Sequence, residues 1–405
     1  MPFSSWVEVD LDILDKNLDA LRRTIGEGRE ILLVVKADAY GHGAVEVART
    51  AAARGVRQLG VATLHEGMQL RAAGIAEDVW VLSPLLASEI PQALAHGLEL
   101  TLPSLEFARE LSEAALKRGL PCRVHVEIDT GMGRTGVDAT EAVDFLLAID
   151  ALPGLRVGSV YTHFPDADAP DPAFTKQQIA RFQEVLSALA QRGLKPPLVH
   201  AANSAGTLRL EEARLGLVRP GLAVYGLLPP EGSDPGLVPA MSFKSRLVQV
   251  RRVRAGRPIS YGRTFQTARD SVIGVVPVGY GHGYSWLCSN RGAMLVAGRR
   301  VPIVGRVTMD LTMLDLTDLA QATGRVPEPG DPVVLFGRQN GEALPVEELA
   351  RWSETLAYEV LCTIGKRVTR VYLRGGRPWR VVTLVGEMDP SVAPHEEAGD
   401  GVSRR

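Results

Sequence analysis

The chain has few cysteines, few aromatic residues and no long apolar run, and these shortages exclude several classes of protein. Its three cysteines are widely separated among 405 residues, so we expect neither a disulfide framework nor a cysteine-based metal site. No apolar stretch approaches the length of a membrane span, and residues 1–11 lack the basic start and apolar core of a signal peptide. We therefore expect a cytoplasmic protein with no membrane partner and no metal.

A surplus of charge of either sign is also missing. The formal net charge is −2 at pH 7, whereas a nucleic-acid-binding chain usually has a basic patch. We expect no nucleic-acid partner. What the chain does have is length, because 405 residues exceed what one ordinary core accommodates, and this predicts two domains.

Between about residue 31 and residue 225, short apolar strands alternate with helical stretches such as Leu105–Arg118 and Ala173–Arg192. Eight strands are predicted: Ile31–Lys36, Gln58–Ala62, Val79–Leu82, Leu98–Leu102, Arg123–Ile128, Leu155–Thr162, Leu198–Ala201 and Gly216–Arg219. Because parallel strands need helical crossovers, eight such repeats predict a (β/α)8 barrel. An open doubly wound sheet is the alternative, but we find no glycine-rich dinucleotide-binding sequence of the kind expected there.

The pattern changes after the proline- and glycine-rich stretch at residues 229–239. Strand-like segments then predominate, and they are Arg246–Val253, Ser271–Val278, Gly292–Val296, Val301–Val304 and Pro332–Phe336. One helical stretch, Pro345–Ile364, interrupts this pattern. The predicted fold is therefore α/β, with an N-terminal (β/α)8 barrel over residues 13–235 and a C-terminal mostly-β domain over residues 236–385. Residues 1–12 contain a half-buried strand pattern at Trp6–Leu11, which we expect to join the β-domain. Residues 386–405 are polar enough to predict a disordered tail.

A lysine closes the first predicted barrel strand, within Val34–Gly43 (VVKADAYGHG). Burial of an ammonium group is costly unless the group is paired or neutralised. Lys36 is therefore either a structural lysine that extends into solvent, or an active-site amine at the carboxyl end of the strand, where barrel active sites lie. In the second case it would form a Schiff base with an aldehyde cofactor, and burial would lower its pKa toward that task.

This stretch closely resembles the cofactor-lysine motif of alanine racemases, and segments that resemble other motifs of that family follow in the same order. They are His125–Gly136 (HVEIDTGMGRTG), His200–Leu208 (HAANSAGTL), Val218–Gly226 (VRPGLAVYG), Ile259–Thr264 (ISYGRT), Pro302–Asp310 (PIVGRVTMD) and Tyr358–Thr363 (YEVLCT). The resemblance extends from about Trp6 to about Val382. It implies a pyridoxal-phosphate enzyme of fold type III that interconverts L- and D-alanine and supplies D-alanine for peptidoglycan. It also implies a head-to-tail homodimer with shared active sites.

The resemblance assigns the two bases of the racemisation to Lys36 and Tyr261. Lys36 would bind the cofactor and, once the substrate amine has displaced it, act on one face of the external aldimine, while Tyr261 would act on the opposite face. A phenol has a reference pKa of about 10, so it needs cationic neighbours to act as a base at neutral pH. The matching candidates are His163 and Arg219, as a hydrogen-bonded relay behind the tyrosine. From the residues alone, Tyr261 would be predicted as a packed tyrosine of the β-domain.

Arg219 has a second implied role, which is to donate a hydrogen bond to the pyridine nitrogen of the cofactor. A guanidinium only donates and keeps its proton, so the ring nitrogen should stay unprotonated. The cofactor would then be a weaker electron sink, which would suppress transamination and favour return of the proton to Cα. A buried structural arginine is the alternative.

The resemblance also implies a set of phosphate-binding residues, which supply hydroxyl groups and backbone N–H groups. The matching residues are Tyr40, Ser204, Tyr358, Gly221 and Leu222. Gly221 and Leu222 follow the last predicted barrel strand, and barrels often bind phosphate after strands seven and eight. Asn203 is a further cofactor-binding candidate, and His200 is predicted as a supporting residue or a core histidine.

The substrate carboxylate would be bound by Arg134 and by the backbone N–H of Met309 from the other subunit, with Asp310 in a structural role. Glu127 is a departure from the family, because many members have there a lysine modified to a carbamate that orients the arginine. Glu127 is already an anion, and a charge-assisted pair with Arg134 would orient it without carbon dioxide. The alternative is that Glu127 points outward from its strand.

Three other functions stay open. A non-catalytic pyridoxal-phosphate carrier would share the barrel and Lys36, but such relatives lack the β-domain and the Tyr261 segment. A decarboxylase of the same fold type normally has an acidic residue at the pyridine nitrogen, where this chain has Arg219. A racemase of broader or serine-directed specificity differs in pocket volume, which the sequence does not define.

Overall fold

The structure is a computed structural model in which residues 3–227 and 236–392 are described. The chain divides into two units, one of residues 13–238 and the other of residues 1–12 together with residues 239–405. Among the described residues, no helix is both long enough and apolar enough to cross a membrane.

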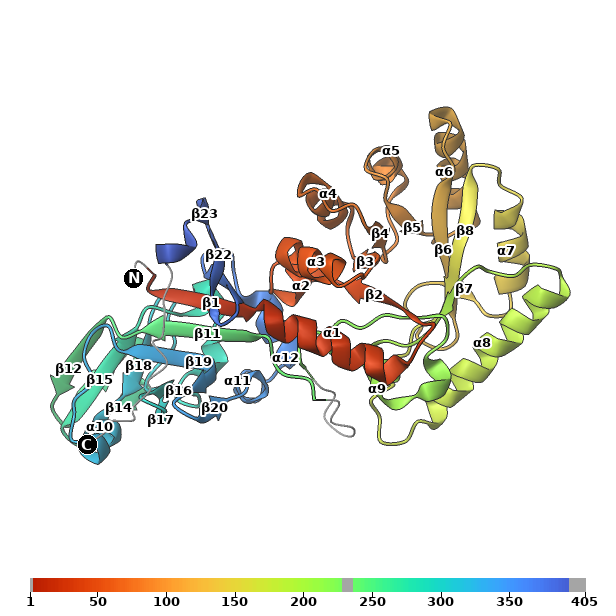
Figure 1. Ribbon diagram of the computed structural model, residues 1–405. Coiled ribbons are helices and arrows are strands. Elements are labelled where there is room, and N and C mark those ends of the chain that lie inside the picture. The colour runs from red at the N-terminus through yellow and green to blue at the C-terminus, as the bar shows by residue number, and fades with distance from the viewer. Residues whose placement is uncertain (1–2, 228–235, 393–405) are drawn as a thin grey trace, which may run out of the picture. The chain divides into compact units, whose positions relative to one another are not determined.

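Eight parallel strands close into a barrel in the first unit (Figure 1). They are β2 (Glu30–Val34), β3 (Gln58–Val61), β4 (Asp78–Val81), β5 (Glu99–Thr101), β6 (Cys122–Asp129), β8 (Leu155–Tyr161), β9 (Val199–His200) and β10 (Leu217–Val218). They pair in this order, and β10 pairs with β2 to close the ring. The short β7 (Val137–Asp138) is added beside β6. Each barrel strand overlaps one of the eight predicted strands, so the predicted barrel is confirmed.

Helices connect successive barrel strands. They are α1 (Leu11–Ile25), which precedes β2, and then α3 (Ala44–Ala53), α4 (Leu64–Ala72), α5 (Ile90–Ala95), α6 (Leu105–Arg118), α7 (Ala142–Asp150), α8 (Ala173–Gln191) and α9 (Ser204–Arg209). Helix α6 shows how local sequence sets the bounds. Ser104 Oγ accepts a hydrogen bond from the N–H of Phe107 at 3.2 Å, and Gly119 ends the helix with a φ of +72°.

The two ends of the barrel differ in their residues. Four neighbouring strands begin with polar residues, which are Glu30, Gln58, Asp78 and Glu99. The carboxyl ends of the strands lead directly into the segments that contain the predicted site residues of this unit. Active sites of this barrel fold lie at the carboxyl ends.

The second unit is mostly β. Its largest sheet has the order β17-β16-β19-β11-β1-β21-β22-β23, with β20 paired to β19, and a second sheet has the order β12-β15-β18. The strands are β1 (Ser5–Asp10), β11 (Met241–Arg246), β12 (Gln249–Val253), β13 (Pro258–Ile259), β14 (Phe265–Gln266), β15 (Ser271–Val276), β16 (Ala293–Val296), β17 (Arg299–Pro302), β18 (Thr312–Asp315), β19 (Pro332–Gln339), β20 (Glu342–Leu344), β21 (Thr369–Arg374), β22 (Arg377–Thr383) and β23 (Gly386–Met388). The predicted fold class, a barrel followed by a mostly-β domain, is confirmed.

The N-terminal strand β1 lies inside the large sheet of this unit. It runs antiparallel to β11 and parallel to β21. Trp6 is 2 % exposed and packs with Val371 and Val381. Residues 5–10 therefore belong to the sheet of the β-domain, although they precede the barrel in sequence.

Three predicted elements of this unit are corrected by the structure. The segment Arg246–Val253 contains a break, because β11 ends at Arg246 in one sheet and β12 begins at Gln249 in another. The N–H of Leu247 bonds to Asp331 O, just before β19, and the N–H of Val248 bonds to Val275 O in β15. The strand predicted at residues 301–304 begins two residues earlier, at Arg299. The helical stretch at residues 345–364 is two helices, α11 (Val346–Trp352) and α12 (Ala357–Thr363), separated at Glu354, whose φ is +54°.

The tail predicted as disordered at residues 386–405 is wrong over its first part. Strand β23 pairs with β22, and a short 3-10 helix, η6 (Pro390–Val392), follows it. Gly386 has a φ of +115°, which allows the turn, and Met388 packs against Trp6, Val371 and Val381. Pairing with β22 and the packing of the partly buried Met388 thus hold a segment whose composition is polar. Residues 393–405 lie outside the described part of the chain.

Candidate functional site

The first barrel strand ends in an unusual backbone turn that begins at Lys36. Ala37, Asp38, Ala39 and Tyr40 all have φ values between 52° and 54°. This left-handed conformation costs an L-residue roughly 1–2 kcal/mol, so four in succession need support from elsewhere. The turn is α2 (Lys36–Tyr40) in Figure 1.

Two carboxylates support this turn. Glu66 Oε1 accepts a hydrogen bond from the N–H of Ala37 at 2.7 Å, and its Oε2 accepts from the N–H of Ala62 at 2.7 Å. Asp38 Oδ1 accepts from the N–H of Ala44 at 2.8 Å. A strained turn that is held in this way is typical of a functional site.

The predicted phosphate-binding residues of the barrel lie together after β9 and β10. Ser204 Oγ accepts hydrogen bonds from the N–H groups of Gly221 at 3.0 Å and Ala223 at 3.2 Å. A Cβ added at Gly221 would lie 2.8 Å from Tyr40 Oη, so a larger residue there would displace the Tyr40 side chain. The structure therefore brings Tyr40, Ser204 and Gly221 together, with Leu222 next along the chain.

Asn203 supports this cradle from behind. Its Oδ1 accepts from the N–H of Gly206 at 3.0 Å and caps α9, and its Nδ2 donates to Phe164 O at 3.2 Å. Both ends of the amide are thus occupied within the chain. In this arrangement Asn203 fixes the turn on which Ser204 lies.

Arg219 follows β10 and is 5 % exposed. Its Nη1 donates to His200 Nδ1 at 2.5 Å. Its Nη2 has three acceptors, which are Thr162 O at 2.8 Å, Ala201 O at 3.0 Å and His163 Nδ1 at 3.1 Å. Among the described residues, none accepts from its Nε. Burial lowers the pKa of Arg219 to about 10, so the guanidinium is still charged at neutral pH.

His163 lies within a cluster of positive charge. Burial and then the charges of Arg219, Arg134 and Lys36 lower the pKa of His163 to about 3. The imidazole is therefore neutral at physiological pH. Because Nδ1 accepts from Arg219, the proton of the ring is on Nε2. The same interactions show that the structure brings these four residues near one another.

Asp129 folds the turn that leads to Arg134. Its Oδ1 accepts from the N–H groups of Gly131 and Met132, both at 2.8 Å, and its Oδ2 accepts from Gly133 at 3.0 Å. Gly133 has a φ of +67°, which suits glycine. Arg134 is exposed on this turn.

Glu127 lies inside the barrel, so the interpretation that it points outward is wrong. Glu127 is 2 % exposed. It lies two residues after His125 on β6, so the two buried side chains are on the same, inner face of the strand. Its Oε2 accepts from Thr135 Oγ1 at 2.7 Å, whereas its Oε1 is buried and has no partner among the described residues. No ion pair joins Glu127 to Arg134 in the described part of the chain. The predicted direct pair is thus replaced by a bond to the neighbouring residue, Thr135.

The predicted site residues of the β-domain lie on its surface. Tyr261 is 73 % exposed, Met309 is 52 % exposed and Tyr358 is 38 % exposed. Tyr261 begins the 3-10 helix η3 (Tyr261–Arg263), directly after Ser260, whose φ is +65°. We call the predicted site residues of the barrel the barrel group, and we call the exposed residues Tyr261, Met309 and Tyr358 the β-domain group.

The loop of Met309 is fastened to its own unit. Met309 O accepts from the N–H of Gly281 at 2.9 Å, and Thr308 O accepts from the N–H of Tyr280 at 3.0 Å. Asp310 Oδ1 accepts from Arg367 Nη2 at 2.8 Å. These contacts hold the loop while the side chain of Met309 remains exposed.

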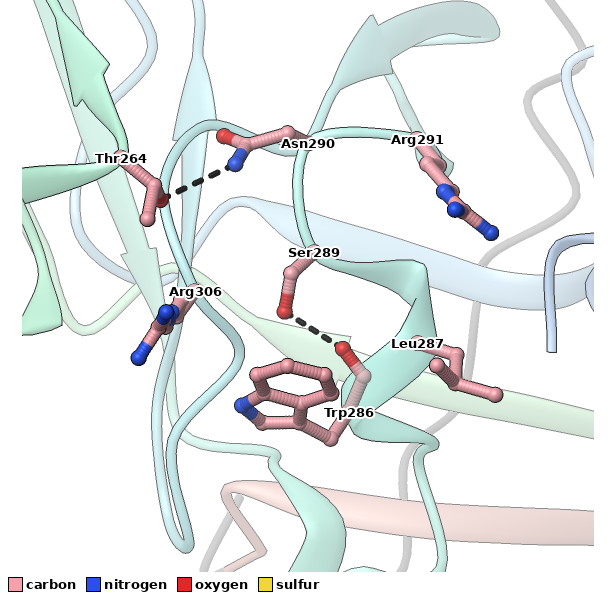
Figure 2. Close-up of a pocket in the computed structure, with 7 residues that line it drawn as sticks. All are labelled: Thr264, Trp286, Leu287, Ser289, Asn290, Arg291 and Arg306. Atoms are coloured by element: carbon pink, nitrogen blue, oxygen red, sulfur yellow. Dashed lines mark hydrogen bonds between the residues drawn. The ribbon is translucent and has the colours of Figure 1, made fainter. Parts of the chain in front are cut away.

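A cavity of about 210 Å³ lies beside the Tyr261 segment (Figure 2). It is lined by Thr264, Trp286, Leu287, Ser289, Asn290, Arg291 and Arg306. The guanidinium of Arg306 lies 5.4 Å from the centre of the Trp286 ring, and Ser260 Oγ donates to Arg306 O at 2.7 Å. Arg306 in the wall of this cavity therefore holds the backbone from which Tyr261 extends, and no motif in the sequence indicates the cavity.

Sequence reasoning also missed two residues that support the Lys36 turn. Glu66 lies 30 residues from Lys36, and its only local pattern is the capping box with Thr63, which predicts the start of a helix. Tyr225 donates from Oη to Val34 O at 2.9 Å, and its ring stacks on His42 with centroids 4.4 Å apart. The motif VRPGLAVYG contains Tyr225 but does not indicate this contact.

Comparisons with known proteins extend over both units. The model of the alanine racemase N-terminal domain matches residues 9–229, and the model of the alanine racemase C-terminal domain matches residues 240–372. An alanine racemase of Desulforamulus reducens is 41 % identical over 372 residues, which cover 91 % of this chain and 98 % of that protein.

Solved structures agree. The structure of an alanine racemase from Bacillus anthracis with bound L-Ala-P has a TM-score of 0.88 and 36 % identity, covering 95 % of this chain and 99 % of that chain. That of an alanine racemase from Bartonella henselae with covalently bound pyridoxal phosphate has a TM-score of 0.82 and 27 % identity, covering 92 % and 100 %.

A (β/α)8 barrel with a lysine turn at its carboxyl end, followed by a β-domain with an exposed tyrosine loop, defines the chain as an amino-acid racemase. More specifically, the chain belongs to the alanine racemase family. The resemblance found in the sequence is confirmed.

Proposed function

We propose that the chain interconverts L- and D-alanine with pyridoxal 5′-phosphate as its cofactor, and so supplies D-alanine for peptidoglycan in the cytoplasm. One observation supports this most directly. At the carboxyl end of the barrel, the structure gathers a lysine amine, a serine and glycine cradle and a buried arginine. The B. anthracis and B. henselae relatives, whose structures are named for L-Ala-P and pyridoxal phosphate, support the choice of substrate and cofactor.

The residues present fit this cofactor in three respects. Lys36 offers a primary amine to the aldehyde. Ser204, Gly221 and Tyr40 form a narrow cradle of hydroxyl and backbone N–H groups, which a Cβ at Gly221 would fill. Arg219 has one remaining donor, Nε, which would bind a ring nitrogen that accepts. Leu222 and Tyr358 would complete the set, and Asn203 would hold the turn on which Ser204 lies.

When bound, the cofactor withdraws electrons from the substrate Cα and so makes the α-proton acidic. Arg219 limits this effect, because it only donates and its pKa of about 10 keeps it protonated at neutral pH. The hydrogen bonds of Nη1 and Nη2 hold the guanidinium in one orientation. Arg219 therefore favours return of the proton to Cα.

Inversion at Cα needs a base on each face. Lys36 Nζ removes or returns the α-proton on one face, and Tyr261 Oη does so on the other. Neutral His163, bonded to Arg219 at 3.1 Å, carries its proton on Nε2 and is able to donate to the tyrosine oxygen. Together they form the relay behind Tyr261.

Arg134 and the backbone N–H of Met309 bind the substrate carboxylate in this proposal. Arg134 is exposed on a turn that Asp129 and Thr135 fix at either side, so its backbone is held while its side chain is able to reach the substrate. Glu127 and His200 act as supporting residues, and Asp310 holds the Met309 loop.

We further propose a homodimer in which each site combines the barrel group of one protomer with the β-domain group of its partner. The exposure of Tyr261, Met309 and Tyr358 in the single chain supports this arrangement, because large apolar and aromatic side chains left exposed are suited to contact with a partner. Tyr280 and Leu311, which flank the same loops, are exposed as well.

A racemisation assay with alanine, serine and lysine tests the proposal, with absorbance of the bound cofactor recorded on the same sample. We expect conversion of alanine in both directions, with lower rates for the other two amino acids. Borohydride reduction followed by peptide mapping should place the cofactor on Lys36. A protein that binds the cofactor on Lys36 but racemises none of the three would instead be a carrier.

A further inference from the structure

Six side chains form a continuous hydrogen-bonded chain through the interior of the barrel. Its links are Glu99 Oε2–His125 Nε2 (2.8 Å), His125 Nδ1–Ser159 Oγ (2.8 Å), Ser159 Oγ–His200 Nε2 (2.9 Å), His200 Nδ1–Arg219 Nη1 (2.5 Å) and Arg219 Nη2–His163 Nδ1 (3.1 Å). We call the part from Glu99 to Arg219 the interior relay. Each of its five residues is 9 % exposed or less.

The interior relay joins the two ends of the barrel. Glu99 is the first residue of β5, whereas Arg219 follows the last residue of β10. At the amino end, Arg123 Nη1 lies 3.4 Å from Glu99 Oε1 and 3.4 Å from Asp78 Oδ2. A small charge cluster at the amino ends of the strands is thus connected to the candidate site at the carboxyl ends.

The donors and acceptors of the interior relay have one consistent arrangement. Arg219 only donates, so His200 accepts at Nδ1 and carries its proton on Nε2. Ser159 Oγ accepts a hydrogen bond from His200 Nε2 and donates one to Nδ1 of His125. The remaining proton of His125 is on Nε2 and is donated to Glu99, which only accepts when ionised.

The protonation states agree with this arrangement. Burial lowers the pKa of His125 by more than its contact with Glu99 raises it, and burial together with the charge of Arg219 lowers the pKa of His200. Each ring therefore carries a single proton at neutral pH. An anion at one end and a cation at the other set the direction of every bond between them.

The rings are also held by packing. Trp80 stacks on His125 with centroids 3.7 Å apart, and Tyr161 stacks on His200 with centroids 4.8 Å apart. Gly158 makes room for this arrangement, because a Cβ there would lie 2.9 Å from Cε1 of His125. Because this packing prevents the two imidazole rings from turning, a change at one end of the relay alters only their tautomers.

We propose that Glu99 is a positioning residue, whose carboxylate fixes the tautomers of His125 and His200 and thereby holds the Arg219 guanidinium from the opposite end of the barrel. The relay itself depends only on contacts within the chain. Its consequence for racemisation, a fixed donor at the ring nitrogen, rests on the proposed function of Arg219.

The first test needs no substitution. In the full-length protein labelled with ¹⁵N-histidine, protonated and unprotonated ring nitrogens have well-separated chemical shifts. We expect His125 and His200 each to show one tautomer, with the proton on Nε2, from pH 6.5 to pH 8.5. A proton on Nδ1 of His200 would overturn the proposal, because Arg219 would then face a donor.

The second test compares Glu99→Gln with Asp78→Asn. Both substitutions remove one carboxylate that faces Arg123 at 3.4 Å, but only Glu99 touches His125. The glutamine has a single acceptor oxygen for two partners, so we expect a mixture of His125 tautomers, and exchange of the Arg219 Nε proton with water roughly tenfold faster. Asp78→Asn should leave both signals unchanged.

Ser159→Ala provides a second variant, because it cuts the relay in its middle and leaves both charged ends in place. It should also speed exchange of the Arg219 proton, even if Glu99→Gln folds poorly. Unchanged exchange in Ser159→Ala would overturn the proposal. Since these signals are recorded without substrate, failure of the relay and failure of the racemase assignment give different results.

Discussion

The two groups of candidate site residues differ in how they are held. In the barrel, the side chains of Arg219, Ser204 and Glu127 are buried and bonded within their own unit. In the β-domain, Tyr261 and Met309 are exposed, although the backbone beneath each is fixed. These barrel side chains are held by contacts within their own unit, whereas Tyr261 and Met309 present their side chains to a surface.

This difference suggests a division of roles. A buried, bonded group suits the binding and orientation of a cofactor, which require preorganised donors. An exposed group on a fixed backbone suits a part of the site that is completed by association. Substitutions that alter one group at a time separate these roles.

The largest effect is expected for Lys36→Ala, which removes the amine from the barrel group. Racemisation should fall by at least about a thousandfold, because both the attachment of the cofactor and one base are lost. Borohydride reduction should no longer label the peptide that contains residue 36. Lys176→Ala, on the exposed side of α8, is the matched control and should behave as the parent protein.

The next largest effect is expected for Tyr261→Phe, which alters only the β-domain group. Racemisation should fall by about a hundredfold to ten-thousandfold, the range for loss of a general base. The barrel group stays intact, so in deuterated water exchange of the α-proton should persist with one enantiomer, which we expect to be D-alanine. Normal racemisation by this variant would show that Tyr261 is not the second base.

A mixing experiment tests whether the two groups meet across subunits. In a mixed dimer of Lys36→Ala and Tyr261→Phe chains, one site has both lesions and the other has none. Random pairing makes roughly half of the dimers mixed, so about a quarter of the parent activity should return. A tagged subunit confirms exchange, and no recovery after confirmed exchange would place both groups of a site within one chain.

The comparison also shows what the sequence is able to predict. The eight barrel strands are short apolar runs flanked by amphipathic helices, and this pattern is local, so their order and extent were predicted closely. The left-handed turn after Lys36 was not, because alanine and tyrosine disfavour that conformation and aspartate adopts it only occasionally. Its support comes from Glu66, whose contact depends on the pairing of two strands.

Polar contacts between distant residues were the least predictable part. The motif HVEIDTGMGRTG contains Glu127, Arg134 and Thr135, and opposite charge favours a pair between the first two. The structure instead bonds Glu127 to Thr135, because the inward position of Glu127 on β6 places it beneath the turn. Similarly, no local pattern joins Glu99 to Arg219, which are 120 residues apart.

The smallest effect is expected for Glu127→Gln, which keeps the shape of the side chain and removes its charge. Its Oε2 bond fixes Thr135 beside Arg134, and its buried Oε1 has no partner among the described residues. If this carboxylate orients the carboxylate-binding arginine, the KM for alanine should rise about 5- to 30-fold, which corresponds to a loss of about 1–2 kcal/mol of carboxylate binding, while kcat changes less. Activity should not depend on added bicarbonate, since a carboxylate needs no carbamylation.

Thr135→Val removes the same bond from the other side and should also raise the KM for alanine. Asp138→Asn is the control and should leave the KM unchanged, because Asp138 is an exposed carboxylate bonded to Thr140 on the same segment. If the double variant Glu127→Gln/Thr135→Val is no worse than either single one, the two residues act as one unit. An unchanged KM in both single variants would show that Arg134 is held by other contacts.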